Sequence, residues 1–329
     1  MTATPFGAEV LPVTRVEMEL TEACNLACRF CYHSRAPRDN HHASAILHRL
    51  ADAGVMEIIL TGGEPALAPD FFDTLDLACE LFPRVMVQSN GTLFADPAVF
   101  ARLAAHKIFC LNFSLHGPRR EHEEMTGVPG SYDAVCAALR AAVRANIRVA
   151  SNLVLHRGNA APQILEESVA LLASIGCKEM TMTRFIPTGL GTGQPLGLSS
   201  AEFCEAVKNL RCACDEHGIS FLLANGAPAC QMPAELRDLC NRCSFGFDKF
   251  YIDVAGNVLV CGMSRQILGN LLEMPLNEVI ARSPLYNRYI TLQHLPLKCL
   301  NCNDLEMCGG GCRAAALAQT GTIDGADHL

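Results

Sequence analysis

The chain has 329 residues, half of them apolar and 18% charged, with a formal net charge of −8. This composition supplies enough apolar side chains for a folded core, which excludes a disordered or collagen-like chain. The acidic balance argues against binding of nucleic acid, and no apolar run reaches the about 20 residues of a membrane helix. Residues 1–17 lack a basic segment followed by an apolar one, so we expect no signal peptide and a cytoplasmic location.

The sequence is rich in cysteine, with 18 residues of this type. Cytoplasmic proteins seldom use structural disulfides, so this many thiols indicates metal or redox chemistry. The cysteines are unevenly distributed, because one group lies between residues 24 and 31 and a larger group lies between residues 240 and 312. We therefore expect two regions of the chain to hold metal.

The first two-thirds of the chain alternates short apolar runs with amphipathic stretches of helical period. Strands are expected at residues 14–20, 55–61, 84–89, 108–115, 148–155 and 179–185. Helices are expected at residues 43–53, 69–81, 97–106, 131–146 and 162–175. This order predicts an α/β fold in which a parallel sheet curls into a partial (β/α)6 TIM-like barrel. Functional groups should gather at the carboxyl ends of its strands.

The pattern changes after residue 187. A loop rich in Gly and Pro covers residues 188–198, a helix is expected at 200–217, and a hairpin at 250–261. We expect a first domain over residues 1–198 with its core at 14–187, a bridging segment at 199–224, and a cysteine-rich domain at 225–329. The last segment has little apolar periodicity, so we expect bound metal to contribute to its folding.

The first cysteine group follows the first predicted strand as Cys24, Cys28 and Cys31, with the spacing CxxxCxxC. Three thiolates on one loop suit a metal centre that keeps one coordination position open. A structural zinc site is the alternative, and it needs a fourth ligand. The nearest candidates for that ligand are His33, His41 and His42.

This spacing, with an aromatic residue before the third cysteine, resembles the signature of radical S-adenosylmethionine (radical SAM) enzymes. The resemblance implies that the three cysteines bind three irons of a [4Fe–4S] cluster, that the fourth iron chelates S-adenosylmethionine, and that Phe30 holds the adenine. Residues 61–65, TGGEP, resemble the GGEP motif of that family. The resemblance implies that this motif surrounds the methionine part of the cofactor; its members here are Gly62, Gly63, Glu64 and Pro65. A plain strand-to-helix turn would explain the glycines and the proline, but not the carboxylate between them.

Further polar residues at the predicted strand ends match positions that bind S-adenosylmethionine in the family. They are Ser89 and Asn90 after the third strand, Asn112, Ser114 and His116 on one face of the fourth, Asn152 on the fifth and Arg184 on the sixth. Each of them alone is also compatible with an ordinary hydrogen-bonded polar residue.

The second cysteine group has the spacing Cx17C with a glycine five residues before its second cysteine, followed by CxxCx5Cx3C. It resembles the SPASM domain, which carries two auxiliary [4Fe–4S] clusters. The resemblance implies that the first cluster is held by Cys240, or alternatively Cys230, together with Cys243, Cys261 and Cys312. The second cluster would take Cys299, Cys302 and Cys308. A pair of structural zinc sites is the alternative.

The second auxiliary cluster lacks a further cysteine downstream of Cys312. Its fourth iron is therefore open or bound by another side chain, unless the cluster is degraded or absent. The candidate ligands are Asp304, Asp324, Asp327 and His328. Among the remaining cysteines, Cys177 is a candidate for donating a hydrogen atom to a substrate radical.

The resemblance implies an enzyme that generates a 5′-deoxyadenosyl radical and abstracts a hydrogen atom from its substrate. We expect a peptide or protein substrate that is oxidised or crosslinked, as by maturases of ribosomal peptides. Two alternatives stay open: maturation of a small molecule or a tetrapyrrole (heme-like) cofactor, and a non-catalytic iron–sulfur electron carrier. The expected partners are a flavodoxin- or ferredoxin-type reductant and a separate peptide-recognition protein, with no membrane and no nucleic acid.

Overall fold

The computed structural model describes residues 13–33 and 38–329. The expectation about a signal peptide at residues 1–17 therefore falls mostly outside the described residues. The strands are β1 (Arg15–Glu19), β2 (Glu57–Thr61), β3 (Arg84–Ser89), β4 (Cys110–Ser114), β5 (Val149–Leu155), β6 (Glu179–Arg184), β7 (Ser220–Leu223), β8 (Lys249–Ile252), β9 (Asn257–Leu259) and β10 (Ile267–Asn270). They form a single sheet in the order β10-β9-β8-β1-β2-β3-β4-β5-β6-β7.

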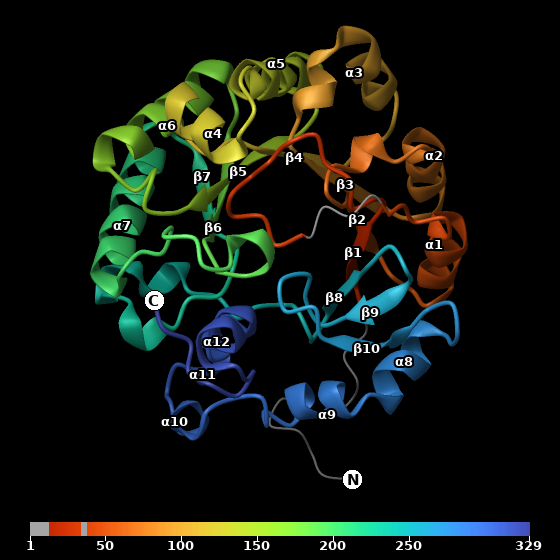
Figure 1. Ribbon diagram of the computed structural model, residues 1–329, viewed down its shortest axis with the longest axis vertical. Coiled ribbons are helices and arrows are strands. Elements are labelled where there is room, and N and C mark those ends of the chain that lie inside the picture. The colour runs from red at the N-terminus through yellow and green to blue at the C-terminus, as the bar shows by residue number, and fades with distance from the viewer. Residues whose placement is uncertain (1–12, 34–37) are drawn as a thin grey trace.

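Strands β1 to β7 pair in parallel, each with the next along the chain. All six predicted strands are present, and no strand end differs from the prediction by more than two residues. Every residue of β2 is buried, as expected for a strand covered on both faces. The sheet curves around a centre with the helices outside, which confirms the predicted partial barrel (Figure 1).

The helices are α1 (Ala43–Asp52), α2 (Phe71–Leu81), α3 (Pro97–Ala104), α4 (Arg119–Thr126), α5 (Ser131–Arg144), α6 (Pro162–Ile175), α7 (Ser200–Glu216), α8 (Leu276–Arg282), α9 (Pro284–Ile290), α10 (Leu297–Leu300), α11 (Leu305–Cys308) and α12 (Arg313–Thr320). Local signals explain several of these boundaries. The Asp96 carboxylate accepts hydrogen bonds from two N–H groups at the start of α3, where Pro97 is the first helical residue. Ser199 and Glu202 form a reciprocal capping box at the start of α7.

The cysteine-rich segment extends the sheet of the barrel. Strand β8 pairs in parallel with β1, and β9 pairs antiparallel with both β8 and β10. The predicted hairpin is thus present, and Gly256 takes a positive φ of +79° in its turn. Leu276, Val279 and Ile280 of α8 belong to the same core as the barrel strands. The C-terminal segment therefore shares an apolar core with the barrel, which its sequence pattern did not predict.

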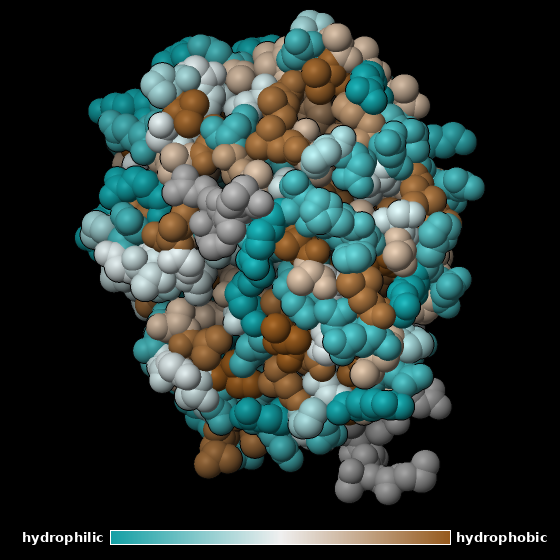
Figure 2. Space-filling model, turned by 45° about the vertical axis from the view of Figure 1, so that its right-hand side comes forward, coloured by the Kyte–Doolittle hydropathy of each residue, from teal (hydrophilic) through white to brown (hydrophobic). Residues whose placement is uncertain are grey.

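The surface seen in Figure 2 is mostly hydrophilic, with smaller apolar patches between the polar side chains. Within the described part of the chain, no helix has the length and apolar character needed to cross a bilayer.

Candidate functional site

A cavity with about 960 Å³ of empty space, partly open to solvent, lies at the carboxyl ends of the barrel strands. The structure brings most of the predicted site residues to its walls: Cys24, Cys28, Phe30, Cys31, Gly62, Gly63, Ser89, Asn90, Ser114, His116, Asn152 and Arg184. These residues come from loops and strands up to 160 positions apart in the sequence. We call this space the barrel cavity.

The three thiols of the first cysteine group line the barrel cavity together. Burial raises the pKa of Cys24, and its Sγ accepts hydrogen bonds from the Leu26 N–H at 3.4 Å and the Asn90 amide at 3.9 Å. A single zinc ion needs sulfurs at about 2.3 Å from one centre. In residues 13–33 and 38–329, no three His, Cys, Asp or Glu side chains converge closely enough to hold one ion.

An iron–sulfur cluster places different demands on its ligands. Each cysteine binds a different iron at a separate corner, so the thiolates stand farther apart than around one ion. Three thiols spread over the wall of one cavity suit this arrangement better than the zinc alternative. The residues present therefore fit a cluster with three thiolate ligands.

The diglycine of residues 62–63 packs directly against the cysteine loop. The Gly63 N–H donates to the Thr21 carbonyl at 2.7 Å, and the Glu64 N–H donates to the Ala23 carbonyl at 2.8 Å. A Cβ at Gly63 would lie 2.4 Å from the Ala23 carbonyl oxygen. Only glycine fits this backbone approach, which places the segment before Cys24 beside the end of β2.

Glu64 differs from the expectation, because its carboxylate does not line the barrel cavity. It is fully buried and accepts hydrogen bonds from the Ser89 hydroxyl at 2.7 Å, the Asn90 N–H at 2.8 Å and the Ala66 N–H at 3.2 Å. These donors hold the ends of β2 and β3 together. Glu64 thus positions the wall of the cavity. Both of its carboxylate oxygens accept hydrogen bonds from other groups of the chain. Pro65 likewise lies outside the lining, at the start of a short 3-10 helix.

Burial raises the pKa of Glu64 from 4.5 to about 7, although its three hydrogen bonds act in the opposite direction. A raised carboxyl pKa means that the folded chain binds a proton more tightly than the unfolded chain. This contribution to stability is fully present below pH 4.5 and is lost as the pH rises through 7.

We expect this titration to be visible by comparing the chain with its Glu64→Gln variant. Between about pH 6 and about pH 8, the free energy of unfolding of the unmodified chain should fall by about 1 kcal/mol relative to the variant. Urea unfolding at several pH values measures this difference. A difference that does not change with pH would contradict the assigned shift.

Phe30 and His116 form another part of the cavity wall. Their rings meet edge to face with centroids 4.7 Å apart, and the His116 ring stacks on His122 at 5.6 Å. Burial lowers the pKa of His116 well below its usual value, and His122 and His156 lower it further. Its Nδ1 accepts a hydrogen bond from the Val154 N–H at 3.3 Å. The wall is therefore formed by a neutral imidazole, which adds no positive charge beside a cationic sulfonium.

Two other predicted residues on the strands differ in their placement. The Asn152 side chain lines the barrel cavity, and its Oδ1 accepts from the hydroxyls of Thr181 and Thr183 at 3.0 and 3.1 Å. Asn112 lies two residues before Ser114 on β4, and it is not among the residues that line the barrel cavity. The predicted contact of Asn112 with the cofactor is therefore not supported by its position.

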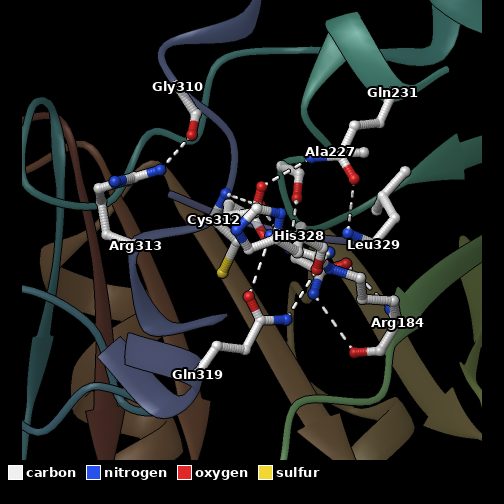
Figure 3. Close-up of polar contacts among 12 residues, drawn as sticks. Arg184, Ala227, Gln231, Gly310, Cys312, Arg313, Gln319, His328 and Leu329 are labelled. Atoms are coloured by element: carbon white, nitrogen blue, oxygen red, sulfur yellow. Dashed lines mark hydrogen bonds and ion pairs between the residues drawn. The ribbon is translucent and has the colours of Figure 1, made fainter. Parts of the chain in front are cut away.

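Arg184 lines the barrel cavity, but its guanidinium is already paired (Figure 3). It donates to the Asp327 carboxylate at 2.6 Å, and also to the His328 carbonyl at 3.3 Å. The side chain is 7% exposed and that of Asp327 is fully buried. Arg184 thus joins the end of β6 to the last residues of the chain, and its binding of S-adenosylmethionine stays a prediction.

Cys177 does not reach the barrel cavity. It is fully buried in the barrel core, where its thiol lies 3.4 Å from the carbonyl oxygens of Val149 and Glu179. Cys177 precedes the amino end of β6, whereas the barrel cavity lies at the carboxyl ends of the strands. The hypothesis that Cys177 donates a hydrogen atom to the substrate is therefore wrong in its geometry.

Several lining residues were not predicted from the sequence. The sequence could have indicated Gln88 of β3 and Thr183 of β6, because side chains two positions apart on a strand share a face. Gln88 is two residues before Asn90, and Thr183 is two residues after Thr181. Tyr32 and Thr188 come from loops around the cavity, as does His33, which the sequence indicated only as a candidate zinc ligand. Met263 had no signal, because it is supplied by the C-terminal segment, more than 200 residues after the cysteine loop.

The second cysteine group divides between two smaller cavities. The first, with about 380 Å³ of empty space, is lined by Cys243, Cys261 and Cys312, and also by the buried His294. Burial raises the pKa of Cys243 to about 11 and that of Cys261 to about 12. The Cys312 thiol raises both pKa values further, and the Cys243 thiol also raises that of Cys261. The residues present fit three of the thiolates predicted for the first auxiliary cluster.

Cys240 is not part of this cavity, which corrects the predicted ligand set. Its thiol is buried in the core shared with the barrel, and the neighbouring cysteine that affects its pKa most is Cys308. Although Cys240 precedes Cys243 by only three residues, its side chain packs into the core and does not line this cavity.

The second of these cavities, with about 400 Å³ of empty space, is lined by Cys230, Cys299, Cys302 and Cys308. Asp304 and Asp327, both predicted as alternative ligands, also line it. Asp324 instead pairs with Arg288 at the surface, and His328 lines a different cavity. The cavity thus contains the three predicted thiols and one thiol that was assigned elsewhere. We call it the four-thiol cavity.

Comparisons with known proteins agree with this arrangement. A model of the Radical SAM superfamily matches residues 18–180, and a model of an iron–sulfur cluster-binding domain, SPASM, matches residues 240–303. A crystal structure of Streptococcus suis SuiB bound to precursor peptide SuiA superposes with a TM-score of 0.78 at 20% identity, over 97% of this chain and 75% of that chain. This likeness concerns the fold.

Three curated relatives align along almost the whole chain. Mycofactocin maturase MftC of Mycolicibacterium smegmatis is 30% identical, over 94% of this chain and 80% of its own length. PqqA peptide cyclase of Gluconobacter oxydans is 26% identical, over 94% and 88% respectively. AdoMet-dependent heme synthase of Oleidesulfovibrio alaskensis is 24% identical, over 93% and 84%. The chain belongs to the radical SAM superfamily and carries a C-terminal SPASM iron–sulfur cluster-binding domain.

Proposed function

We propose that this radical SAM enzyme modifies a peptide or protein substrate by abstracting a hydrogen atom and thereby oxidising or crosslinking it. The observation that carries the proposal is the composition of the barrel cavity. Its wall combines the three thiols of the cysteine loop with Met263 of the SPASM domain, so one space adjoins both halves of the molecule. Relatives that span the whole chain include a peptide cyclase and a maturase, which supports a peptide as the substrate.

Cofactor binding follows from the residues that line this cavity. Cys24, Cys28 and Cys31 would hold a [4Fe–4S] cluster, and S-adenosylmethionine would lie beside the diglycine. When bound, these groups supply a 5′-deoxyadenosyl radical on one-electron reduction.

The remaining walls orient and shield the reacting parts. The rings of Phe30 and His116 close one side of the cavity and exclude water. The neutral His116 imidazole adds no charge that would repel the sulfonium. Because Glu64 is occupied by hydrogen bonds of the chain itself, the backbone of residues 62–63 is the part of the motif that faces the cofactor.

A tetrapyrrole substrate is the second candidate. It is favoured by the AdoMet-dependent heme synthase that aligns with 93% of this chain. The chain is 24% identical to this heme synthase and 30% identical to the maturase, which is why a peptide is the preferred substrate.

A flavodoxin- or ferredoxin-type reductant and a separate peptide-recognition protein belong to the same proposal. Reduction of the cluster requires an electron donor of low potential. The many thiols at the cavities need a reducing compartment, which supports the cytoplasm as the location.

The test is an anaerobic reaction of the reconstituted enzyme with S-adenosylmethionine, a reductant and one of two substrates. One substrate is a short precursor peptide encoded beside the gene, and the other is a porphyrin with propionate side chains. We expect 5′-deoxyadenosine in both the presence and the absence of substrate, and a mass change of the peptide by oxidation or crosslinking. Mass spectrometry measures both products.

Each contrary outcome removes a different part of the proposal. A change of the porphyrin with an unchanged peptide would reject the peptide substrate. Absence of 5′-deoxyadenosine, with the clusters fully reconstituted, would reject the radical reaction. A non-catalytic iron–sulfur electron carrier would then be the remaining alternative.

A further inference from the structure

We propose that Cys230 is the fourth ligand of the second auxiliary cluster, completing a set of four thiolates with Cys299, Cys302 and Cys308. All four cysteines line the four-thiol cavity. A [4Fe–4S] cluster is expected to have four cysteine ligands. The C-terminal cysteine array, residues 299–312, contributes only Cys299, Cys302 and Cys308 to this cavity. The fourth comes from the segment before the array, about 70 residues upstream.

The segment that carries Cys230 is bonded to the cysteine array. The Ala229 N–H donates to the Cys308 Sγ at 3.4 Å, and the Cys308 Sγ lies 3.8 Å from the Ala227 carbonyl. Cys230 itself belongs to a short 3-10 helix, Ala229–Gln231. The residue next to Cys230 therefore contacts a predicted cluster ligand directly. Hydrogen bonds to ligand sulfurs of this kind are typical of iron–sulfur sites.

The backbone that precedes Cys230 also packs closely against the cysteine array, at Gly226. A Cβ at Gly226 would lie 3.1 Å from the Gly311 carbonyl carbon and 3.4 Å from the Cys312 nitrogen. Any larger residue at position 226 would push the segment away from the array. The glycine allows the backbone before Cys230 to lie against the loop that ends the array.

The last residues of the described chain hold the Cys230 segment in place (Figure 3). The Gln231 amide donates to the Asp327 carbonyl at 2.8 Å and accepts from the Leu329 N–H at 2.9 Å. Because Gln231 is adjacent to Cys230, this double contact fixes the thiol beside the cavity. The position of Cys230 is therefore built by three segments of the chain.

The two carboxylates at the same cavity are less suitable ligands. Asp304 precedes the first residue of α11 and lies within the array itself. The Asp327 carboxylate has one oxygen that accepts from Arg184 and from the Cys312 N–H, at 2.6 and 2.8 Å. These two bonds occupy only Oδ2, and Oδ1 is buried without a hydrogen-bond partner among the described residues, so Asp327 is the competing ligand that the labelling experiment tests. Thiolate is also the softer ligand, which iron–sulfur clusters prefer.

The first experiment labels thiols in the intact chain with iodoacetamide before and after anaerobic reconstitution. Cys230 and Cys212 are both exposed, so Cys212 on α7 serves as an internal control. Ligation should lower the labelling rate of Cys230 by at least about tenfold and leave that of Cys212 unchanged. Peptide mass spectrometry gives the rate at each position.

Three outcomes of this labelling are decisive. Protection of Cys230 together with Cys299, Cys302 and Cys308 supports the proposal. Protection of those three with Cys230 still reactive overturns it, because another group then holds the fourth iron. Continued reactivity of all four overturns it as well, because the cavity then holds no cluster.

The second experiment distinguishes ligation from simple shielding. The Cys230→Ala and Cys212→Ala variants are reconstituted, oxidised mildly and examined by EPR and iron analysis. A cluster with only three thiolate ligands loses one iron readily, and the barrel cluster and the first auxiliary cluster can do so in both variants. The excess is therefore diagnostic: Cys230→Ala should show about one more three-iron cluster per chain than Cys212→Ala. Identical spectra and iron contents in both variants would overturn the proposal.

This inference does not depend on the substrate in the proposed function. Protection of Cys24, Cys28 and Cys31 in the same labelling reaction reports on the barrel cavity separately. A failure at Cys230 with protection at the cysteine loop would leave the radical reaction intact.

Discussion

Replacing Cys24, Cys28 and Cys31 together by alanine is expected to abolish cleavage of S-adenosylmethionine, with a loss of at least about 10⁴-fold. The three thiols line one wall of the barrel cavity, and the cysteine loop is held there by backbone hydrogen bonds to residues 63 and 64. Without the thiolates no iron is bound beside the diglycine. The measurement combines iron analysis with the yield of 5′-deoxyadenosine.

The auxiliary clusters should survive in this variant. Their thiols line two other cavities and share no residue with the cysteine loop. The expected iron loss therefore corresponds to a single four-iron cluster. Loss of all iron would mean that the clusters assemble interdependently, and full retention of iron and cleavage would contradict the assigned site.

A Cys177→Ala variant is the matched control. Cys177 is a buried cysteine of the barrel core that does not line any of these three cavities. We expect the iron content and the cleavage of S-adenosylmethionine to stay as in the unmodified chain. A specific loss of substrate modification in this variant would restore Cys177 as a hydrogen-atom donor.

The barrel could be predicted from the sequence because its strands carry local signals. Runs such as residues 57–61 are apolar along their whole length, and the structure buries all of them. Strand β7 was missed, because it has only four residues and most of them are partly or fully exposed. The pairing of β8 with β1 was also missed, since it joins residues more than 230 positions apart. A contact of that kind leaves no periodicity in either segment.

The site could be predicted where several ligands lie close together on one loop. It could not be predicted where its geometry depends on the direction in which a single side chain points. The spacing of Cys24, Cys28 and Cys31 is enough to place them on one wall. The motif around Glu64 does not reveal that its carboxylate turns toward Ser89 and Asn90. Spacing alone therefore identifies the segment but does not predict the direction of its carboxylate.

The ligand sets of the SPASM domain show the same limit. The resemblance to the SPASM domain implies Cys240, or alternatively Cys230, as the ligand of the first auxiliary cluster that precedes Cys243. In the structure Cys240 packs into the core, whereas Cys230 lines the four-thiol cavity. The difference arises from the packing of residues 226–231 against the end of the array. Such packing is a property of the folded chain and is not visible in the intervals between cysteines.

The buried pair of Arg184 and Asp327 leads to the largest expected effect on stability. Arg184 ends β6 of the barrel, and Asp327 accepts its guanidinium at 2.6 Å while also accepting the Cys312 N–H at 2.8 Å. This carboxylate therefore connects the barrel to the cysteine array. A Cβ at Gly311 would lie 2.4 Å from the same carboxylate, so the array is shaped to receive it.

We expect Asp327→Ala to lower the free energy of unfolding by about 3–5 kcal/mol, because it leaves the Arg184 charge buried without a partner. Denaturant unfolding followed by circular dichroism measures the loss. Asp324→Ala is the matched control, three residues earlier, where the carboxylate pairs with Arg288 at the surface. That exposed pair is expected to contribute little, since solvent screens it.

A third variant separates loss of the pair from the presence of an unpaired charge. When Arg184→Met is combined with Asp327→Leu, both charges are replaced by apolar side chains, and much of the stability should return. If Asp327→Ala were as mild as Asp324→Ala, the pair would not join the barrel to the array. If the double variant were as unstable as Asp327→Ala, the hydrogen bond from the Cys312 N–H would account for more of the stability than the ion pair does.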